Sequence, residues 1–138
     1  MLKIIGSVEC CALKEFEIPA IDARIDTGAQ TSSLHATKIE VFRKKKVKWV
    51  RFEVAFDQDE KQLSFICETP VLTRRTVKTS NENSEKRLII KTPLTIGETT
   101  FEIELTLANR ENMEYKMLLG REALNGRFLV NPAESYLV

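Results

Sequence analysis

Two stretches of this sequence alternate between apolar and polar side chains, and this alternation constrains the fold more than any other feature. The first is residues 46–56 (KVKWVRFEVAF), and the second is residues 100–107 (TFEIELTL). A period of two places apolar side chains on one face of a β-strand and polar side chains on the other. Each stretch therefore predicts a strand with one face in the core and one face in water.

Shorter apolar and β-branched runs between turn signals predict further strands. They are residues 2–5, 8–13, 20–25, 37–42, 63–68, 71–78, 87–96 and 117–119. Pro93 interrupts the run 87–96, and we expect it at an edge, a bulge or a break, because proline has no N–H for the ladder. The one segment that looks helical is 121–125, between Gly120 and Gly126. Many short strands separated by turns predict an all-β fold, closed into a barrel, with one short C-terminal helix.

The composition is that of an ordinary globular protein and limits the partners. The 138 residues fit one domain, residues 1–138. The 21 basic and 20 acidic residues give a net charge of +1, which argues against nucleic acid or an anionic membrane bound mainly through bulk charge. No apolar run approaches the ~18 residues of a transmembrane helix, and the N-terminus lacks a signal-peptide pattern. We therefore expect a cytoplasmic protein.

The cysteines and the single histidine form no recognisable metal-binding pattern. Cys10, Cys11 and Cys67 are an odd number, and two of them are adjacent, so a disulfide scaffold is not expected. We expect all three to be reduced and buried as small apolar side chains. His35 is expected to be structural, because no ordered partner accompanies it. No cofactor or metal is expected, although a zinc site built from these four residues stays an alternative.

Residues 21–34 (IDARIDTGAQTSSL) are the first segment that points to chemistry. A strand runs into Asp26, and the chain then turns at Thr27 and Gly28, where glycine permits conformations and close approaches that other residues avoid. Thr27 and the N–H groups that follow can hydrogen-bond the carboxylate and hold it rigidly. Taken alone, this motif has an equally good alternative, an Asp-Thr-Gly turn in an unrelated β-protein.

The second segment, residues 117–124 (MLLGREAL), is an apolar strand followed by Gly120, Arg121 and a short helix. An Asp-Thr-Gly-Ala turn followed later by an apolar-apolar-Gly-Arg segment resembles the retropepsins, the aspartic proteases of retroviruses. More narrowly, the chain resembles a bacterial retropepsin-like family long labelled an ATP-dependent zinc protease. The similarity covers about residues 21–132, through IDTGAQTSSLHA, RRTVKTS, TLANRENM and MLLGREALNGRFLVNP.

The residues favour an aspartic-protease site over an ATP-binding site or a zinc site. The chain has no GxxxxGK[ST] loop for ATP phosphates and no zinc-ligand pattern. Such a site needs two aspartates that share one proton, one acting as base and the other as acid. The chain has one Asp-Thr-Gly, and Asp22 follows no such turn. The second aspartate is therefore expected from another copy, in a C2 homodimer with Asp26 of each copy at the axis.

The resemblance also implies a role for individual residues. A hairpin of residues 71–91, with the polar stretch 79–86 at its tip, would close as a flap over a peptide or protein substrate. The implied site residues are Asp26, Thr27 and Gly28 for catalysis; Ala29, Gln30, Arg75 and Val77 for substrate binding; and Gly120 and Arg121 for structural support.

One position departs from the retroviral pattern. Retroviral proteases usually carry a second aspartate after Gly-Ala, which pairs with the arginine of the Gly-Arg motif, whereas this chain has Gln30 there. The bidentate brace between Arg121 and a carboxylate is thus lost or replaced. Glu122, Asp22 and the end of the short helix are the candidates to replace it.

Two other functions stay open as alternatives. The family's association with ATP-grasp glutamate ligases in bacteria suggests a non-catalytic module, a possible ligase partner, whose groove binds an extended peptide by strand addition. A zinc hydrolase, following the family label, is the third interpretation. The apolar ends MLKII and SYLV are expected either to interleave between two copies or to pair within one chain.

Overall fold

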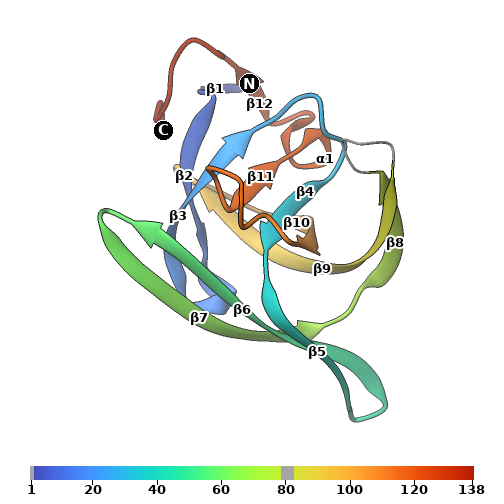
Figure 1. Ribbon diagram of the computed structural model, residues 1–138. Coiled ribbons are helices and arrows are strands. Elements are labelled where there is room, and N and C mark those ends of the chain that lie inside the picture. Colours follow the sequence, from blue (N-terminus) through green and yellow to red (C-terminus); the bar gives the residue numbers. More distant parts are fainter. Residues whose placement is uncertain (1, 79–82) are drawn as a thin grey trace.

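The computed structural model describes residues 2–78 and 83–138, and most of its regular structure is strand (Figure 1). The strands are β1 (Lys3–Ile5), β2 (Val8–Leu13), β3 (Ile18–Ile25), β4 (Ser32–His35), β5 (Thr37–Lys44), β6 (Val47–Gln58), β7 (Lys61–Pro70), β8 (Thr73–Lys78), β9 (Ser84–Ile96), β10 (Thr99–Ala108), β11 (Met117–Leu119) and β12 (Phe128–Val130). The helices are the 3-10 helix η1 (Lys14–Phe16) and the α-helix α1 (Arg121–Leu124), which lies within the predicted segment 121–125. Neither of these helices, in the ranges described, has the length and apolar character needed to cross a membrane.

Within the described residues, six strands close into a barrel in the order β10, β4, β11, β3, β2 and β9, and β9 pairs back to β10. The pairs β3–β11 and β4–β10 are parallel, while β2–β3 and β9–β10 are antiparallel. The prediction of an all-β fold closed into a barrel is confirmed. The parallel pair β3–β11 brings the C-terminal ends of these two strands together, and Asp26 and Gly120 directly follow these ends.

Two structures extend from the barrel (Figure 1). Strands β5, β6 and β7 form a separate antiparallel sheet. Strand β8 continues the barrel sheet at its edge and pairs with β9, from Thr73 opposite Ile89 to Lys78 opposite Ser84. The predicted tip, residues 79–86, lies partly outside the described residues. Residues 84–86 were wrongly predicted to belong to the tip, because they are the first residues of β9. Their polar side chains are exposed, which a strand paired at the edge of the sheet allows.

Apolar side chains from both sheets fill one core. Phe52 of β6 is fully buried, as the alternation predicts. Phe16 of η1 packs edge-on against it, with ring centroids 5.7 Å apart, and this contact joins η1 to the sheet of β5, β6 and β7. Cys11 and Cys67 belong to the same core, and all three cysteines are free thiols. Cys10 is partly exposed, contrary to the prediction, because neighbouring residues of a strand point to opposite faces.

Pro93 does not break β9. It lies opposite Glu102 of β10, in a stretch between the pairing with β8, which ends at Ile89, and the pairing with β2, which begins at Thr95. One side of β9 is therefore an edge at this point, and a residue without an N–H is accommodated there. Of the three expected positions, the edge is the one observed.

The two apolar ends of the chain each lie against another segment of the same chain. Strand β1 runs parallel to β12, with Ile4 opposite Leu129. The C-terminal residues follow β2 without forming a strand, and the Tyr136 N–H donates to the Val8 carbonyl (2.9 Å). MLKII thus supplies β1 beside β12, whereas SYLV follows β2, so the two ends do not pair with each other. Interleaving between two copies stays a prediction. Ile4 and Leu129 nevertheless stay 54% and 53% exposed, so this small sheet presents an apolar surface.

A buried carboxylate anchors the C-terminal segment. Glu9 is fully buried and accepts hydrogen bonds from the N–H groups of Gly6 (2.7 Å), Leu137 (2.8 Å) and Val138 (3.4 Å). Glu9→Gln would keep one acceptor oxygen for the Gly6 and Leu137 N–H groups, but it would remove the charge and place an NH2 donor against the Val138 N–H. We therefore expect the free energy of unfolding to fall by about 1–3 kcal/mol. Urea unfolding measures the change, with the exposed Glu15→Gln as control. Equal stability of the two variants would contradict the anchoring role.

Candidate active site

Asp26 follows β3 directly and begins a tight turn whose hydrogen bonds fix its carboxylate. Its N–H donates to the Leu119 carbonyl of β11 (2.9 Å). The Gly28 N–H donates to Asp26 Oδ1 (2.9 Å), and the Ala29 N–H donates to the Asp26 carbonyl (3.2 Å). A Cβ on Gly28 would lie 3.1 Å from Oδ1, so glycine suits this close approach. One oxygen of the carboxylate is thus held by the backbone, while Asp26 remains partly exposed.

The start of α1 clamps the other arm of the turn. The Arg121 N–H donates to the Ala29 carbonyl (2.8 Å), and the Glu122 N–H donates to the Gln30 carbonyl (3.0 Å). These N–H groups belong to the first turn of a helix, where they have no partner within the helix. The predicted supporting segment therefore supports the turn through backbone bonds.

The Arg121 side chain binds the same turn. Its Nη1 donates to the Thr27 carbonyl (3.0 Å). None of the three candidates, Asp22, Glu122 and the end of the short helix, replaces the missing carboxylate, because the acceptor is in the turn itself. Asp22 and Glu122 accept hydrogen bonds from other groups. With Gln30 in the position of the usual acid, a backbone carbonyl takes the place of the carboxylate as the acceptor.

The turn faces the β8–β9 hairpin across an open cleft of about 700 Å³. All of the residues that were predicted to bind substrate line this cleft, together with Gly28 of the turn. They are Ala29, Gln30, Arg75 and Val77. A smaller cavity of about 330 Å³ has Asp26 in its wall, and Leu118 borders both spaces. Thr27 is exposed and borders neither, so its observed part in the site is the carbonyl that Arg121 binds.

Basic side chains are prominent in the walls of both spaces. They are Arg75, Lys78 and Arg87 in the larger and Arg24 and Arg110 in the smaller. Arg75 and Arg87 form ion pairs with glutamates at 2.8 and 2.7 Å. The other three form no ion pair with any residue in the ranges 2–78 and 83–138. Among the described residues, the wall of the larger cleft contains no acidic side chain, so its excess of positive charge favours an anionic ligand. In the smaller cavity Asp26 and Glu114 balance the two arginines.

His35 is a buried structural residue. Its Nδ1 accepts the Arg110 N–H (2.8 Å). Burial lowers the pKa of its imidazole, and the positive charge of Lys116 lowers it further, so the ring is predominantly neutral at pH 7. As far as the chain is described, no group of three His, Cys, Asp or Glu side chains is placed to hold a metal ion.

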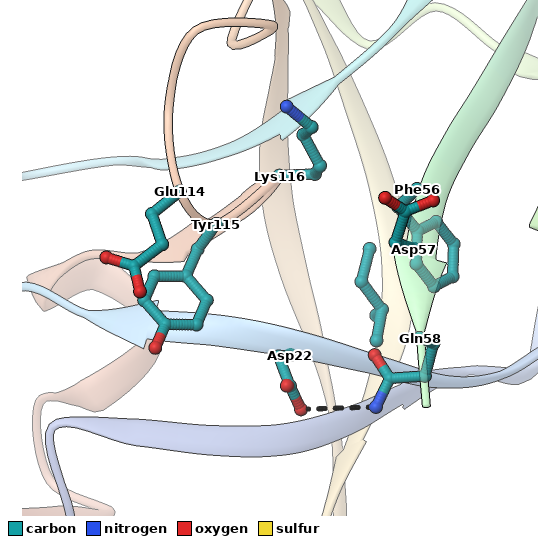
Figure 2. Close-up of a pocket in the computed structure, with 8 residues that line it drawn as sticks. Asp22, Phe56, Asp57, Gln58, Glu114, Tyr115 and Lys116 are labelled. Carbon is teal, nitrogen blue, oxygen red and sulfur yellow. Dashed lines mark hydrogen bonds between the residues drawn. The ribbon is translucent and has the colours of Figure 1, made fainter. Parts of the chain in front are cut away.

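A third cavity, of about 210 Å³, contains Asp22 and is bordered by Glu114 and Tyr115 on one side and by the end of β6 on the other (Figure 2). Gln58 Nε2 donates to Asp22 Oδ1 at 3.5 Å. The Tyr136 hydroxyl donates to Asp22 Oδ2 (2.8 Å), and this bond raises the pKa of Tyr136 to about 12. Both oxygens of Asp22 therefore accept hydrogen bonds within the chain.

A closed β-barrel in which an Asp-Thr-Gly turn is clamped by a Gly-Arg segment defines a retropepsin-like protein. The chain belongs to the RimB-like family, whose model is described as the retropepsin-like aspartic endopeptidase RimB and matches residues 4–138. The predicted resemblance to bacterial retropepsin-like proteins is confirmed by this match.

The curated relatives carry a different name. The chain is 47% identical over 133 residues to a probable alpha-L-glutamate ligase of Shewanella pealeana, across 96% of this chain and 29% of that protein. A relative of the same name from Desulfotalea psychrophila is 47% identical over 131 residues, across 95% of this chain and 28% of that protein. The chain thus spans less than a third of these relatives. A Legionella pneumophila protein of unknown function has a crystal structure that matches with a TM-score of 0.79 and 29% identity, covering 98% of this chain and 97% of that one.

Proposed function

We propose that this chain is an aspartic endopeptidase whose catalytic pair is Asp26 from each of two copies in a C2 homodimer. The observation that supports this most directly is the Asp26 turn, which holds one carboxylate oxygen on a backbone N–H at the wall of a cavity. In this proposal Gly28 holds the carboxylate through its N–H, and Thr27 fixes the turn through the carbonyl that Arg121 binds. Gly120 and Arg121 hold the turn against the barrel.

The proposed reaction needs two carboxylates that share one proton, because two like charges at short range cannot both form easily. The ionised carboxylate takes a proton from water, whose oxygen attacks the carbonyl carbon of the peptide bond. The protonated carboxyl donates a hydrogen bond to the carbonyl oxygen. When the tetrahedral intermediate collapses, the C–N bond breaks and a proton passes to the leaving amine, which restores the shared proton.

The partner carboxylate comes from a second copy in this proposal. Asp22 is unsuited, because both of its oxygens accept hydrogen bonds within the chain. Glu114 borders the same cavity as Asp26, but it is exposed and belongs to the loop 109–116. The exposed Ile4 and Leu129 offer apolar surface that a second copy would bury.

The charge of the cleft supports an acidic substrate. Ala29 and Gln30 would lie along one side of an extended peptide, and Arg75 and Val77 of β8 along the other. Lys78, which has no ion-pair partner among the described residues, adds positive charge to the same wall. Relatives named as glutamate ligases fit this ligand chemistry. We therefore propose a glutamate-rich peptide as the substrate and an ATP-grasp glutamate ligase as a partner.

Incubation of the purified chain with a labelled peptide of α-linked glutamates tests the proposal, with a glutamine peptide of equal length as control. We expect internal fragments from the glutamate peptide and a mass of about 32 kDa by light scattering, twice the 15.8 kDa of one chain. A monomer at every concentration, together with an intact peptide, would overturn the proposal.

The length of the relatives favours a second candidate, a non-catalytic module that works with a ligase. The chain matches only 28–29% of proteins that are named as ligases. In this case the cleft would hold the glutamate-rich peptide while a glutamate ligase acts on it. Binding of the peptide by a monomer that never cleaves it would favour this candidate over the peptidase.

A further inference from the structure

The loop 109–116, between β10 and β11, is shaped by two of its own basic side chains. Lys116 Nζ donates to the carbonyls of Arg110 (3.4 Å), Glu111 (2.6 Å) and Met113 (3.2 Å). Arg110 Nε and Nη2 both donate to the Tyr115 carbonyl, at 3.3 and 3.2 Å. Two bonds from one guanidinium to one oxygen fix the orientation of its plane. The loop therefore presents Arg110 in a defined direction.

The backbone of Arg110 is also tied to the barrel. Its N–H donates to Nδ1 of His35 (2.8 Å), and the N–H of His35 donates to the Lys116 carbonyl (2.7 Å). His35 belongs to β4 and is 5% exposed. Because both bonds connect the loop to a buried strand, the barrel itself sets the position of Arg110.

This position brings Arg110 beside Asp26 without pairing the two. Both border the cavity of about 330 Å³. Burial lowers the pKa of Arg110, the positive charge of Arg87 lowers it further, and the negative charge of Asp26 raises it. Arg110 forms no ion pair with any carboxylate in the described part of the chain, including the exposed Glu114 at the same cavity. Of the five N–H donors that a guanidinium carries, two bind the Tyr115 carbonyl.

We propose that Arg110 is a specificity-determining residue that binds the carboxylate of an acidic substrate side chain next to the scissile bond. The inference rests on the proposed peptidase function. A half-buried guanidinium without a carboxylate partner has lost part of its hydration, and a bound carboxylate compensates for this loss with charge-assisted hydrogen bonds. In a C2 dimer each copy supplies one Arg110, so acidic side chains are recognised on both sides of the scissile bond.

Two peptides that differ only at the residues flanking the cleavage point, with glutamate in one and glutamine in the other, test this role. The wild-type protein is expected to prefer the glutamate peptide by about 10- to 100-fold in kcat/KM. Arg110→Gln is expected to lower that preference by about tenfold or more. Arg127→Gln is the matched control, because Arg127 Nη1 also donates to a backbone carbonyl, that of Ala123 (3.3 Å), yet Arg127 borders neither space of the site. The control is expected to keep the preference.

Peptide binding measured with Asp26 replaced by asparagine separates this inference from the peptidase proposal. A preference for the glutamate peptide that disappears when Arg110→Gln is added supports the inference, even where no form of the protein cleaves. An unchanged preference, or no preference in the parent, overturns it. Should Arg110→Gln fail to fold, single glutamine substitutions along the peptide provide the test with the wild-type protein. The loss must then be largest at the two flanking positions, and a uniform loss overturns the inference.

Discussion

Asp26→Asn is expected to lower kcat/KM on a glutamate-rich peptide by about 10³-fold or more. Asparagine keeps an oxygen that can accept the Gly28 N–H (2.9 Å in the native turn), so the turn closes as before. The amide cannot take a proton from water or share one with a second carboxylate. Initial rates of cleavage measure the loss, and urea unfolding is expected to show a change of less than about 1 kcal/mol.

Asp22→Asn is the matched control for this variant. Asp22 lies on β3, the strand that leads into Asp26, and its oxygens bind Gln58 and Tyr136 within the chain. Its replacement is expected to leave cleavage in place. An equal loss in both variants would indicate a general effect of charge or folding. Full activity of Asp26→Asn would mean that the aspartic mechanism is wrong.

Mixing wild-type protein with Asp26→Asn shows whether the pair is shared between copies. If each dimer needs both aspartates and the copies exchange freely, activity follows the square of the wild-type fraction, which is about one quarter in an equal mixture. If Asp26 works with a carboxylate of its own chain, such as Glu114, activity follows the fraction itself and falls to about one half. A linear decline would therefore contradict the shared pair while preserving the role of Asp26.

Alternation of side chains is sufficient to predict strands that face water on one side. Phe52 of β6 is buried and its neighbour Arg51 is exposed, as the period of two requires. The same rule fails for β4, whose four residues are all buried although two are serines. The Ser33 hydroxyl lies 2.7 Å from that of Thr106, 73 positions further along the chain. A hydroxyl whose burial depends on so distant a partner leaves no local pattern to detect.

In the candidate site, too, some residues could be predicted from the sequence and others could not. The turn could be predicted because Asp26 and Gly28, which bond to each other, are two positions apart. The cleft residues of β8 came from the family resemblance. Arg110 was not identified, because its position depends on backbone carbonyls and on His35 across the barrel. The acceptor of the Arg121 side chain could not be predicted either, because it is the backbone carbonyl of Thr27. Every residue carries a carbonyl, so the sequence does not mark this one.

Gly120→Ala is expected to displace the Asp26 turn. A Cβ on Gly120 would lie 2.7 Å from the Thr31 carbonyl oxygen and 2.8 Å from the Ala29 carbonyl oxygen. Both atoms are backbone of the arm that follows Asp26, so the arm itself has to shift. We expect the free energy of unfolding to fall by about 1–3 kcal/mol, as for other overpacked sites. We expect kcat/KM to fall about 100-fold, because a shift of ~1 Å at a reacting group has an effect of this size.

Gly126→Ala is the control that separates displacement of the Asp26 turn from a general loss of folding stability. Gly126 follows α1 with a φ of +78° and open space around the position of a Cβ, so alanine strains its own backbone without touching the turn. Both variants add one methyl group beside the same short helix, and both are expected to lose stability in urea unfolding. At a temperature where both are folded, a loss of cleavage confined to Gly120→Ala would show that the contact between Gly120 and the arm positions Asp26. Normal cleavage by a folded Gly120→Ala would mean that the turn holds its carboxylate without support from this segment.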